Sequence, residues 1–274
     1  MTNNPNQALW QKGDFTQIAA LMRTSGAAVV QSLRLAPPLR ALDLGCGDGT
    51  TAVPLAQAGA SVLGVDIAEN LVAAGRARAA SLGLGDRLRF QHGDACQLQG
   101  LADGTVDVDL AVRRVMNAPR PLEAAKEMVR VTKPGGRIVM GNWIPDDPTS
   151  FVSQLLRICS AFVPPPPPGA ESPMKWGVEA HIHERFAAAG VPKERITTAR
   201  DTYTFAADDL EPDELIARFR RFYGPTMNAF DAAAATGREA ELEQQLVALA
   251  HAQNRAGGRG TAIPATFLRV TVQR

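Results

Sequence analysis

The chain has 274 residues with a formal net charge of +1, and 45% of its residues are hydrophobic, enough for one large α/β domain or two small ones. The balanced charge gives no reason to expect electrostatic capture of nucleic acid or of a membrane surface. Three cysteines without a C-x-x-C pair argue against a disulfide framework or a zinc site and indicate a reducing compartment. Because no apolar run approaches the ~20 residues of a membrane span and no signal pattern is seen, we expect a cytoplasmic protein.

Residues 7–35 carry apolar side chains at roughly helical spacing, with breaks expected near Gly13 and Gly26. The later part of this segment is typical of a helix that covers a sheet edge. The earlier part places two aromatic residues, Trp10 and Phe15, on either side of a flexible glycine. This part either closes over a ligand as a lid or packs as ordinary core, and both interpretations stay open.

The rest of the chain is organised around residues 40–51, RALDLGCGDGTT. The pattern predicts a short strand, a turn rich in glycine and the start of a helix. The glycines tolerate positive φ and leave the backbone open to the close approach of a ligand; they are Gly45, Gly47 and Gly49. Thr50 or Thr51 is expected to cap the helix.

The next predicted strand, residues 61–65, ends in Asp66, about 20 residues after the glycines, where a carboxylate can accept hydrogen bonds from both hydroxyls of a ribose. Two cofactor classes use this arrangement. Dinucleotide binders typically show G-x-G-x-x-G, whereas this turn has G-x-G-x-G preceded by Asp43. An acid beside the turn suits the cationic amine of S-adenosylmethionine (SAM), so the spacing favours SAM over NAD.

Two further acidic residues lie in or just after the next two predicted strands. Asp94 follows the strand at residues 88–92, at the edge where open α/β sheets bind ligands. In a SAM enzyme it would accept a hydrogen bond from the adenine amine; the alternative is a helix cap. Asp109 lies inside the strand at residues 106–112, where a parallel sheet is normally apolar on both faces. We therefore expect Asp109 to be paired, or the strand to be frayed or exposed there.

Two arginines, Arg113 and Arg114, directly follow this fourth strand, close to where a methyl group would be delivered. One hypothesis is that either pairs with Asp109 or with an acidic group of the substrate. The alternative is that both are solvated.

The second half of the chain loses the regular alternation of strand and helix. Five consecutive prolines at residues 164–168 predict a rigid connector. The other predicted elements are helices at 122–131, 151–162 and 178–189, strands at 137–142, 196–206 and 266–273, and a helical region at 208–256 that breaks at Tyr223, Gly224 and Pro225.

The chain resembles the class I SAM-dependent methyltransferases of the bacterial small-molecule type. LDLGCGDG at 42–49 matches their first motif, GVDI at 64–67 their ribose segment and GDA at 93–95 their adenine segment. The resemblance implies a Rossmann-like α/β sheet of seven strands, order 3-2-1-4-5-7-6, with the last strand antiparallel. The cofactor residues that it implies are Asp43, Gly45, Cys46, Gly47, Gly49, Asp66, Ile67, Asp94, Ala95 and Ala111.

The same resemblance implies a single domain over residues 1–274, in which the cofactor core spans 37–145. Residues 1–36 would form a helical lid, and two insertions, 146–176 and 207–260, would cap the active site. One departure lies at 113–117, where relatives carry a small, apolar run and this chain has RRVMN. That change puts the type of substrate, and to a lesser degree activity, in doubt.

The resulting hypothesis is a methyltransferase that acts on a small-molecule acceptor mainly by positioning. The alternatives are a SAM-binding protein without turnover and, with less support, an NAD-dependent dehydrogenase. We expect neither a metal nor a nucleic acid or membrane partner, and a monomer or a homodimer.

No catalytic residue stands out, and the weak candidates for a base are His181, Tyr223 and Asp14. Several aromatic residues and one arginine are candidates for contact with the acceptor: Trp10, Phe15, Arg113, Trp143, Trp176 and Tyr223. The aromatic ones would either form a wall that holds a planar or apolar acceptor or belong to ordinary core.

Overall fold

The computed structural model describes residues 4, 6–112, 117–167, 169 and 171–274. Within this part of the chain, seven strands form one sheet in the order β3-β2-β1-β4-β5-β7-β6. The strands are β1 (Arg40–Leu44), β2 (Ser61–Asp66), β3 (Leu88–His92), β4 (Val106–Val112), β5 (Thr132–Trp143), β6 (Ile196–Ala207) and β7 (Thr261–Gln273). Only β7 runs against its neighbours, because it pairs antiparallel with both β5 and β6. The predicted strand order and the antiparallel last strand are thus confirmed.

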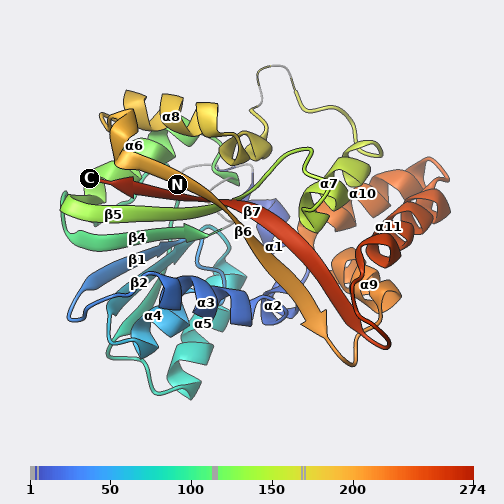
Figure 1. Ribbon diagram of the computed structural model, residues 1–274, viewed down its shortest axis with the longest axis horizontal. Coiled ribbons are helices and arrows are strands. Elements are labelled where there is room, and N and C mark those ends of the chain that lie inside the picture. Colours follow the sequence, from blue (N-terminus) through green and yellow to red (C-terminus); the bar gives the residue numbers. More distant parts are fainter. Residues whose placement is uncertain (1–3, 5, 113–116, 168, 170) are drawn as a thin grey trace.

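Helices cover both faces of the parallel strands (Figure 1). On one face lie α6 (Pro121–Val131) and α8 (Glu179–Ala188); on the other lie α3 (Arg23–Ser32), α4 (Ala52–Gln57) and α5 (Glu69–Ser81). The amphipathic pattern of α6 explains its position, since its buried residues are Ala124, Ala125, Met128 and Val131.

Strands β6 and β7 extend past the end of the neighbouring strand β5. Their pairing continues to Ala207 and Thr261, well past Trp143 at the end of β5. This extension carries a helical group beyond the carboxyl edge of the sheet, made of α7 (Phe151–Ser160), α9 (Pro212–Phe222), α10 (Gly224–Ala235) and α11 (Glu239–Gln253) (Figure 1). Two short helices, α1 (Gln7–Gln11) and α2 (Thr16–Ala20), lie between this group and the sheet.

Several predicted boundaries differ from the structure. Gly26 does not break a helix but lies inside α3. Glycine is needed at this position because a Cβ would lie 2.1 Å from the carbonyl oxygen of Thr50. The expected side-chain cap is also absent: Thr51 is the N-cap residue of α4, but its Oγ1 accepts no helix amide and instead donates to Asp43 Oδ2 at 2.6 Å. Between α10 and α11 the chain breaks a second time at Gly237, where φ is +69°.

Asp109 contradicts the expectation that it is paired, frayed or exposed. It lies in regular β4 with no exposed surface, and neither carboxylate oxygen has a hydrogen-bond partner in the described chain. Arg113 and Arg114, the proposed partners, fall outside the described residues. Burial, and then the negative charge of Asp43, raise the pKa of Asp109 well above its ordinary value of 3.8. The protonated, neutral form of the carboxyl group is therefore favoured in the folded chain.

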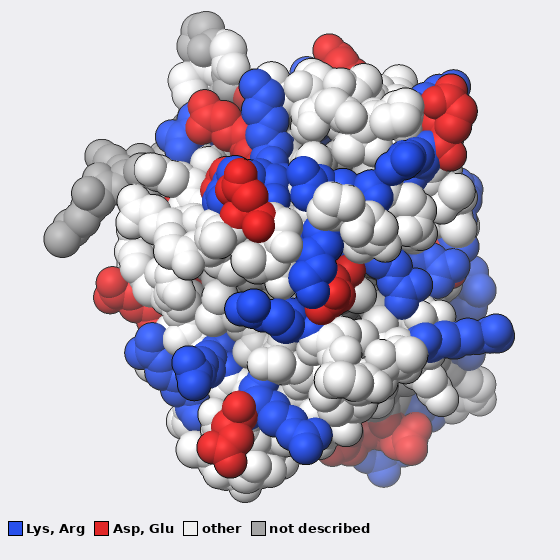
Figure 2. All heavy atoms as spheres, turned by 90° about the vertical axis from the view of Figure 1, so that its left-hand side faces the viewer, with Lys and Arg blue, Asp and Glu red and all other residues white. Residues whose placement is uncertain are grey.

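The face at the amino ends of the parallel strands carries basic side chains with acidic ones between them (Figure 2). It lies across the sheet from the carboxyl edge, where the glycine turn is found. In the described part of the chain, no helix is both long and apolar enough to cross a membrane.

Candidate functional site

The glycine turn leaves β1 and folds back over the end of β2. Gly45 and Gly47 have φ of +67° and +55°, which residues with a Cβ rarely adopt. The amides of Gly45 and Cys46 both donate to the carbonyl of Val65, at 2.7 and 3.1 Å. These bonds hold the turn against the carboxyl edge of the sheet, with its backbone next to the end of β2.

Asp66, the last residue of β2, binds the glycine turn through its carboxylate. Its Oδ2 accepts from the Gly47 amide at 2.7 Å, and its Oδ1 accepts from the Ala68 amide at 2.9 Å. A carboxylate offers about four lone-pair positions. Asp66 is therefore held rigidly by two backbone bonds and keeps further capacity to accept hydrogen bonds from a ligand.

Asp94 follows β3 at the same edge. Its Oδ1 accepts from the Cys96 amide at 2.9 Å, and its Oδ2 accepts from Asn4 Nδ2 at 3.2 Å. Arg120 lies 4.0 Å from Oδ2. No described helix begins at Asp94, so the structure does not place it as a helix cap.

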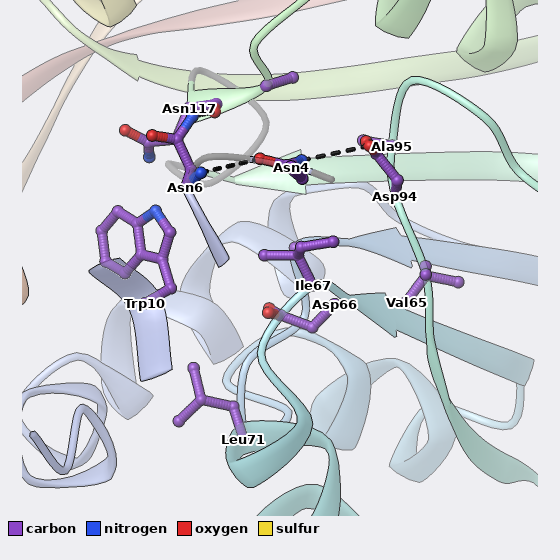
Figure 3. A pocket seen from close by; sticks show the side chains of 13 residues that line it. Asn4, Asn6, Trp10, Val65, Asp66, Ile67, Leu71, Asp94, Ala95 and Asn117 are labelled. Atoms are coloured by element: carbon purple, nitrogen blue, oxygen red, sulfur yellow. Dashed lines mark hydrogen bonds between the residues drawn. The ribbon is translucent and has the colours of Figure 1, made fainter. Parts of the chain in front are cut away.

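Gly45, Asp66 and Asp94 line one cavity, called here the edge cavity (Figure 3). Its free volume is about 50 Å³, because the side chains of Asn4 and Asn6 enter it from the N-terminal segment. Trp10 stands on the side opposite Asp94 and Ala95. The lining residues are Asn4, Asn6, Trp10, Gly45, Val65, Asp66, Ile67, Leu71, Gly93, Asp94, Ala95, Asn117 and Ala118.

Half of the predicted cofactor residues line the edge cavity: Gly45, Asp66, Ile67, Asp94 and Ala95. The other five do not line it. Asp43 and Ala111 are buried within the strands, and Cys46 is buried behind the turn. Gly47 contributes its amide to Asp66. Gly49 serves packing, since a Cβ there would lie 2.9 Å from the ring of Phe90.

The N-terminal asparagines were missed in the sequence, because a short polar segment carries no periodic signal. Asn6 Nδ2 donates to the carbonyl of Asn117 at 2.6 Å, and the amide of Asn6 donates to Asn4 Oδ1 at 3.0 Å. Together with the bond from Asn4 to Asp94, these contacts fasten the chain start across the edge cavity (Figure 3).

A second, apolar cavity of about 30 Å³ adjoins the first. We call it the aromatic pocket; its lining residues are Trp10, Phe15, Ile18, Met22, Trp143, Val152, Phe205, Phe219 and Tyr223. Four of the five predicted aromatic residues meet here. The fifth, Trp176, does not: it is buried elsewhere, with its ring under the guanidinium of Arg185 at 4.4 Å and beside Phe186. Phe205 and Phe219 take part instead.

Two of the weak catalytic candidates lie outside both cavities. His181 is on α8, 3.4 Å from Glu184. Asp14 is exposed and accepts hydrogen bonds from Thr16 and Gln17. Tyr223 does line the aromatic pocket, whereas Arg113 falls outside the described residues. Among the described residues, no cluster of three or more His, Cys, Asp or Glu is placed to hold a metal ion.

Cys96 lies beside Asp94 but is not suited to act as a nucleophile. Burial raises the pKa of its thiol to about 12. The thiolate is the reactive form of cysteine, so this side chain serves packing.

Comparison with known proteins agrees with this fold. Residues 42–140 match the family model described as a methyltransferase domain. The uncharacterized protein Rv1403c of Mycobacterium tuberculosis is 33% identical over 82% of this chain and 79% of its own length. The chain belongs to the class I SAM-dependent methyltransferases.

Two further likenesses are more limited. The sterol 4-C-methyltransferase strm-1 of Caenorhabditis elegans is 34% identical over 41% of this chain and 33% of that protein. The crystal structure of the YcgJ protein of Bacillus subtilis matches 92% of this chain and 98% of that chain with a TM-score of 0.57 at 18% identity. The structural likeness shows a shared fold.

Proposed function

We propose that this protein transfers a methyl group from SAM to a small-molecule acceptor. The observation that carries the proposal is the convergence of Gly45, Asp66 and Asp94 on one cavity. SAM presents a cationic amino acid end, a ribose with two hydroxyls and an adenine with an amine. A glycine turn and two carboxylates along one sheet edge match these groups in that order.

The described site fits this cofactor in its donors and acceptors. Asp66 retains lone pairs for the ribose hydroxyls after its two backbone bonds. The Asn4 amide donates to Asp94 Oδ2 where the adenine amine would donate. Asp43 is buried below the turn and receives the Thr51 hydroxyl, so it adds negative potential without filling space.

When bound, SAM supplies a methyl group on a sulfonium: an acceptor lone pair bonds to the methyl carbon, the carbon–sulfur electron pair returns to sulfur to leave S-adenosylhomocysteine, and any acceptor proton passes to solvent. The only carboxylates in the described cavity lining are those of Asp66 and Asp94, and both are held by backbone amides. Such groups position a ligand better than they remove protons. We infer that the chain acts mainly by holding donor and acceptor in line.

The proposal also includes the size of the acceptor and the compartment in which the protein works. A small acceptor is supported by the apolar pocket beside the edge cavity. The sterol named for the worm relative does not identify it, because that alignment covers only a third of that protein. A reducing, cytoplasmic setting is supported by three buried free cysteines.

The test is a thermal-shift titration with S-adenosylhomocysteine, SAM and NAD in parallel. A ligand at about 100 times its dissociation constant adds about 2.7 kcal/mol of stability. We expect a shift with the two adenosyl compounds and none with NAD. Asp66→Asn should reduce the shift, while Asp86→Asn, on the exposed surface, should leave it intact. A shift with NAD alone would overturn the proposal.

Turnover is measured separately, as S-adenosylhomocysteine released with a panel of small acceptors. Binding with release supports the methyltransferase. Binding without release from any acceptor would instead support a SAM-binding protein that lacks turnover.

A further inference from the structure

The connection between β3 and β4, residues 93–105, contains no helix. Parallel strands are usually joined by a helix, and such helices cover the sheet. On one face of β3, Phe90 is buried against α5, where a Cβ at Gly75 would lie 2.5 Å from its ring. On the other face, Arg89 of β3 is exposed and Leu63 of β2 is only half-buried. This part of the sheet is therefore open on one face.

A groove of about 540 Å³ lies on this open face, and we call it the amino-edge groove. It is lined by the first residues of β1, β2 and β3, by the turn before β3 and by the end of the helix-free connection. Its volume falls in the range of about 300–1,000 Å³ that is typical of small-molecule sites. None of its described lining residues belongs to the edge cavity, which lies at the other end of the same strands.

Three arginines line the amino-edge groove: Arg40, Arg87 and Arg89. The strand register places Arg40 beside Ser61 and Arg89 beside Leu63. Ser61 and Leu63 are two residues apart on β2, so they point to one face of the sheet. Arg40 and Arg89, their neighbours in register, project from that same face. Strand spacing and rise put the two arginine Cα atoms about 12 Å apart, so both side chains can reach one ligand from opposite sides.

The charge of the amino-edge groove is positive. Asp86 is the one acidic side chain among its described lining residues, so the three arginines leave an excess of two positive charges. Their guanidiniums make no hydrogen bond or ion pair within the described chain. Asp107, which accepts from the Arg40 amide, is already neutralised by Lys133 at 2.6 Å. The face at the amino ends of these strands carries further basic side chains (Figure 2).

We propose that the amino-edge groove binds a phosphate monoester, with the phosphate between Arg40 and Arg89. A guanidinium binds phosphate through two parallel N–H bonds, and a phosphate monoester carries a charge of about −1.5 to −2 at pH 7, which matches the excess positive charge. The organic body lies on Leu63 and Leu101, both half-buried in the groove lining. The ligand is bound away from the cofactor, so it is distinct from the methyl acceptor.

The probe is phenyl phosphate, titrated calorimetrically into the full chain and compared with inorganic phosphate. We expect phenyl phosphate to bind at least about fivefold more tightly, because its ring adds apolar contact. Rising salt should weaken its binding, since the arginines are exposed and their charges are screened. No binding of phenyl phosphate, or equal binding of the two phosphates, would overturn the inference.

Variants locate the probe. Arg40→Ala and Arg89→Ala should each weaken phenyl phosphate by about fivefold or more, as expected for loss of a charge-assisted hydrogen bond. Both side chains are exposed, so thermal stability should stay the same. Arg89→Lys, which keeps the charge and loses the planar fork, should show an intermediate loss. The matched control is Arg259→Ala, on a side chain that is 89% exposed outside the groove. Equal losses in variants and control would overturn the inference.

A second titration is made with the chain saturated by S-adenosylhomocysteine. Because the two sites share no described lining residue, phenyl phosphate should bind with the same affinity as before. Competition between the two ligands would place the probe in the edge cavity and overturn the inference. The methyl transfer proposal is tested by S-adenosylhomocysteine itself, so the two proposals fail separately.

Discussion

Asp109 stands in the middle of the parallel sheet, beside Leu42 on β1 and Ile138 on β5. In the folded chain burial, and then the charge on Asp43, oppose its ionisation and raise its pKa. The unfolded chain ionises near the ordinary value of 3.8. Above that pH the folded state binds more protons than the unfolded state, so the contribution of Asp109 to stability falls as the pH rises toward its raised folded pKa.

Asp109→Asn should therefore be more stable than the natural chain at neutral pH. The difference should vanish near pH 3 and grow by up to about 1.4 kcal/mol per pH unit between the unfolded and folded pKa values. Chemical denaturation of both proteins across this range measures it. A constant difference at all pH values would contradict the prediction.

The control lies on the same strand. At Asp107 partial burial opposes ionisation, but hydrogen bonds from Lys133 and from the Arg40 amide outweigh it and lower the pKa. The contribution of Asp107 to the stability of the fold is therefore present at neutral pH and lost as the pH falls through its lowered pKa. Asp107→Asn should accordingly lower the free energy of unfolding at pH 7.

Asn4 donates its side-chain amide to Asp94 Oδ2 at 3.2 Å. Because its amide donates to the oxygen that the adenine amine would use, Asn4→Ala should tighten S-adenosylhomocysteine binding by about three- to tenfold, as expected for removal of a competing charge-assisted bond. Calorimetric titration measures this. Asn6→Ala, which loses only the bond to Asn117, should not tighten binding. Weaker binding by Asn4→Ala would make Asn4 a cofactor contact instead of a competitor.

At the scale of elements, α1 is held in place by α10. Lys12 Nζ lies 2.7 Å from Asn228 Oδ1 and 2.5 Å from Asp231 Oδ2. At the start of α10, Gly224 approaches the carbonyl of Leu9 so closely that a Cβ would lie 2.4 Å from it. The small residue therefore sets the position of α1, and with it the indole of Trp10 between the two cavities.

Gly224→Ala should push α1 away from α10, because a backbone carbonyl cannot move aside as a side chain can. We expect lower thermal stability, by about 1–3 kcal/mol, and weaker binding of S-adenosylhomocysteine. Gly85→Ala is the control, since nothing lies within 4 Å of its added Cβ. Unchanged binding in Gly224→Ala would show that the position of α1 does not matter to the edge cavity.

At the scale of the whole molecule, one hydrophobic core runs from the sheet into the helical group beyond it. Strands β6 and β7 belong to both parts, as they pair along their full length and β7 also pairs with β5. The assignment of lid and cap roles to the segments around the site stays a prediction. The shared strands nevertheless predict that sheet and helices unfold together.

Differential scanning calorimetry should then show one transition with equal calorimetric and van't Hoff enthalpies. At about 0.7 kcal/mol per residue, its enthalpy near 60 °C should be about 190 kcal/mol. Two resolved transitions would mean that α9, α10 and α11 form a separate unit.

The sequence by itself determined the sheet order through its resemblance to a family, and the order of elements through local patterns. It also indicated where Gly45, Asp66 and Asp94 would meet. Each of these residues lies at the end of a parallel strand or within two residues after it, and the carboxyl ends of such strands share one edge. Placement along the chain is therefore enough to bring them together, and the structure places all three in the edge cavity.

Tertiary structure alone decided which aromatic residues meet and how Asn4 and Asp109 are placed. In the sequence Trp176 looks as suitable for the aromatic pocket as Trp143, yet it packs against Arg185 instead. Phe205 and Phe219 line the pocket, although nothing in the sequence singled them out. These contacts join segments from distant parts of the chain. Their geometry follows from close packing of whole elements, which depends on shape in three dimensions and leaves no periodic trace in any one segment.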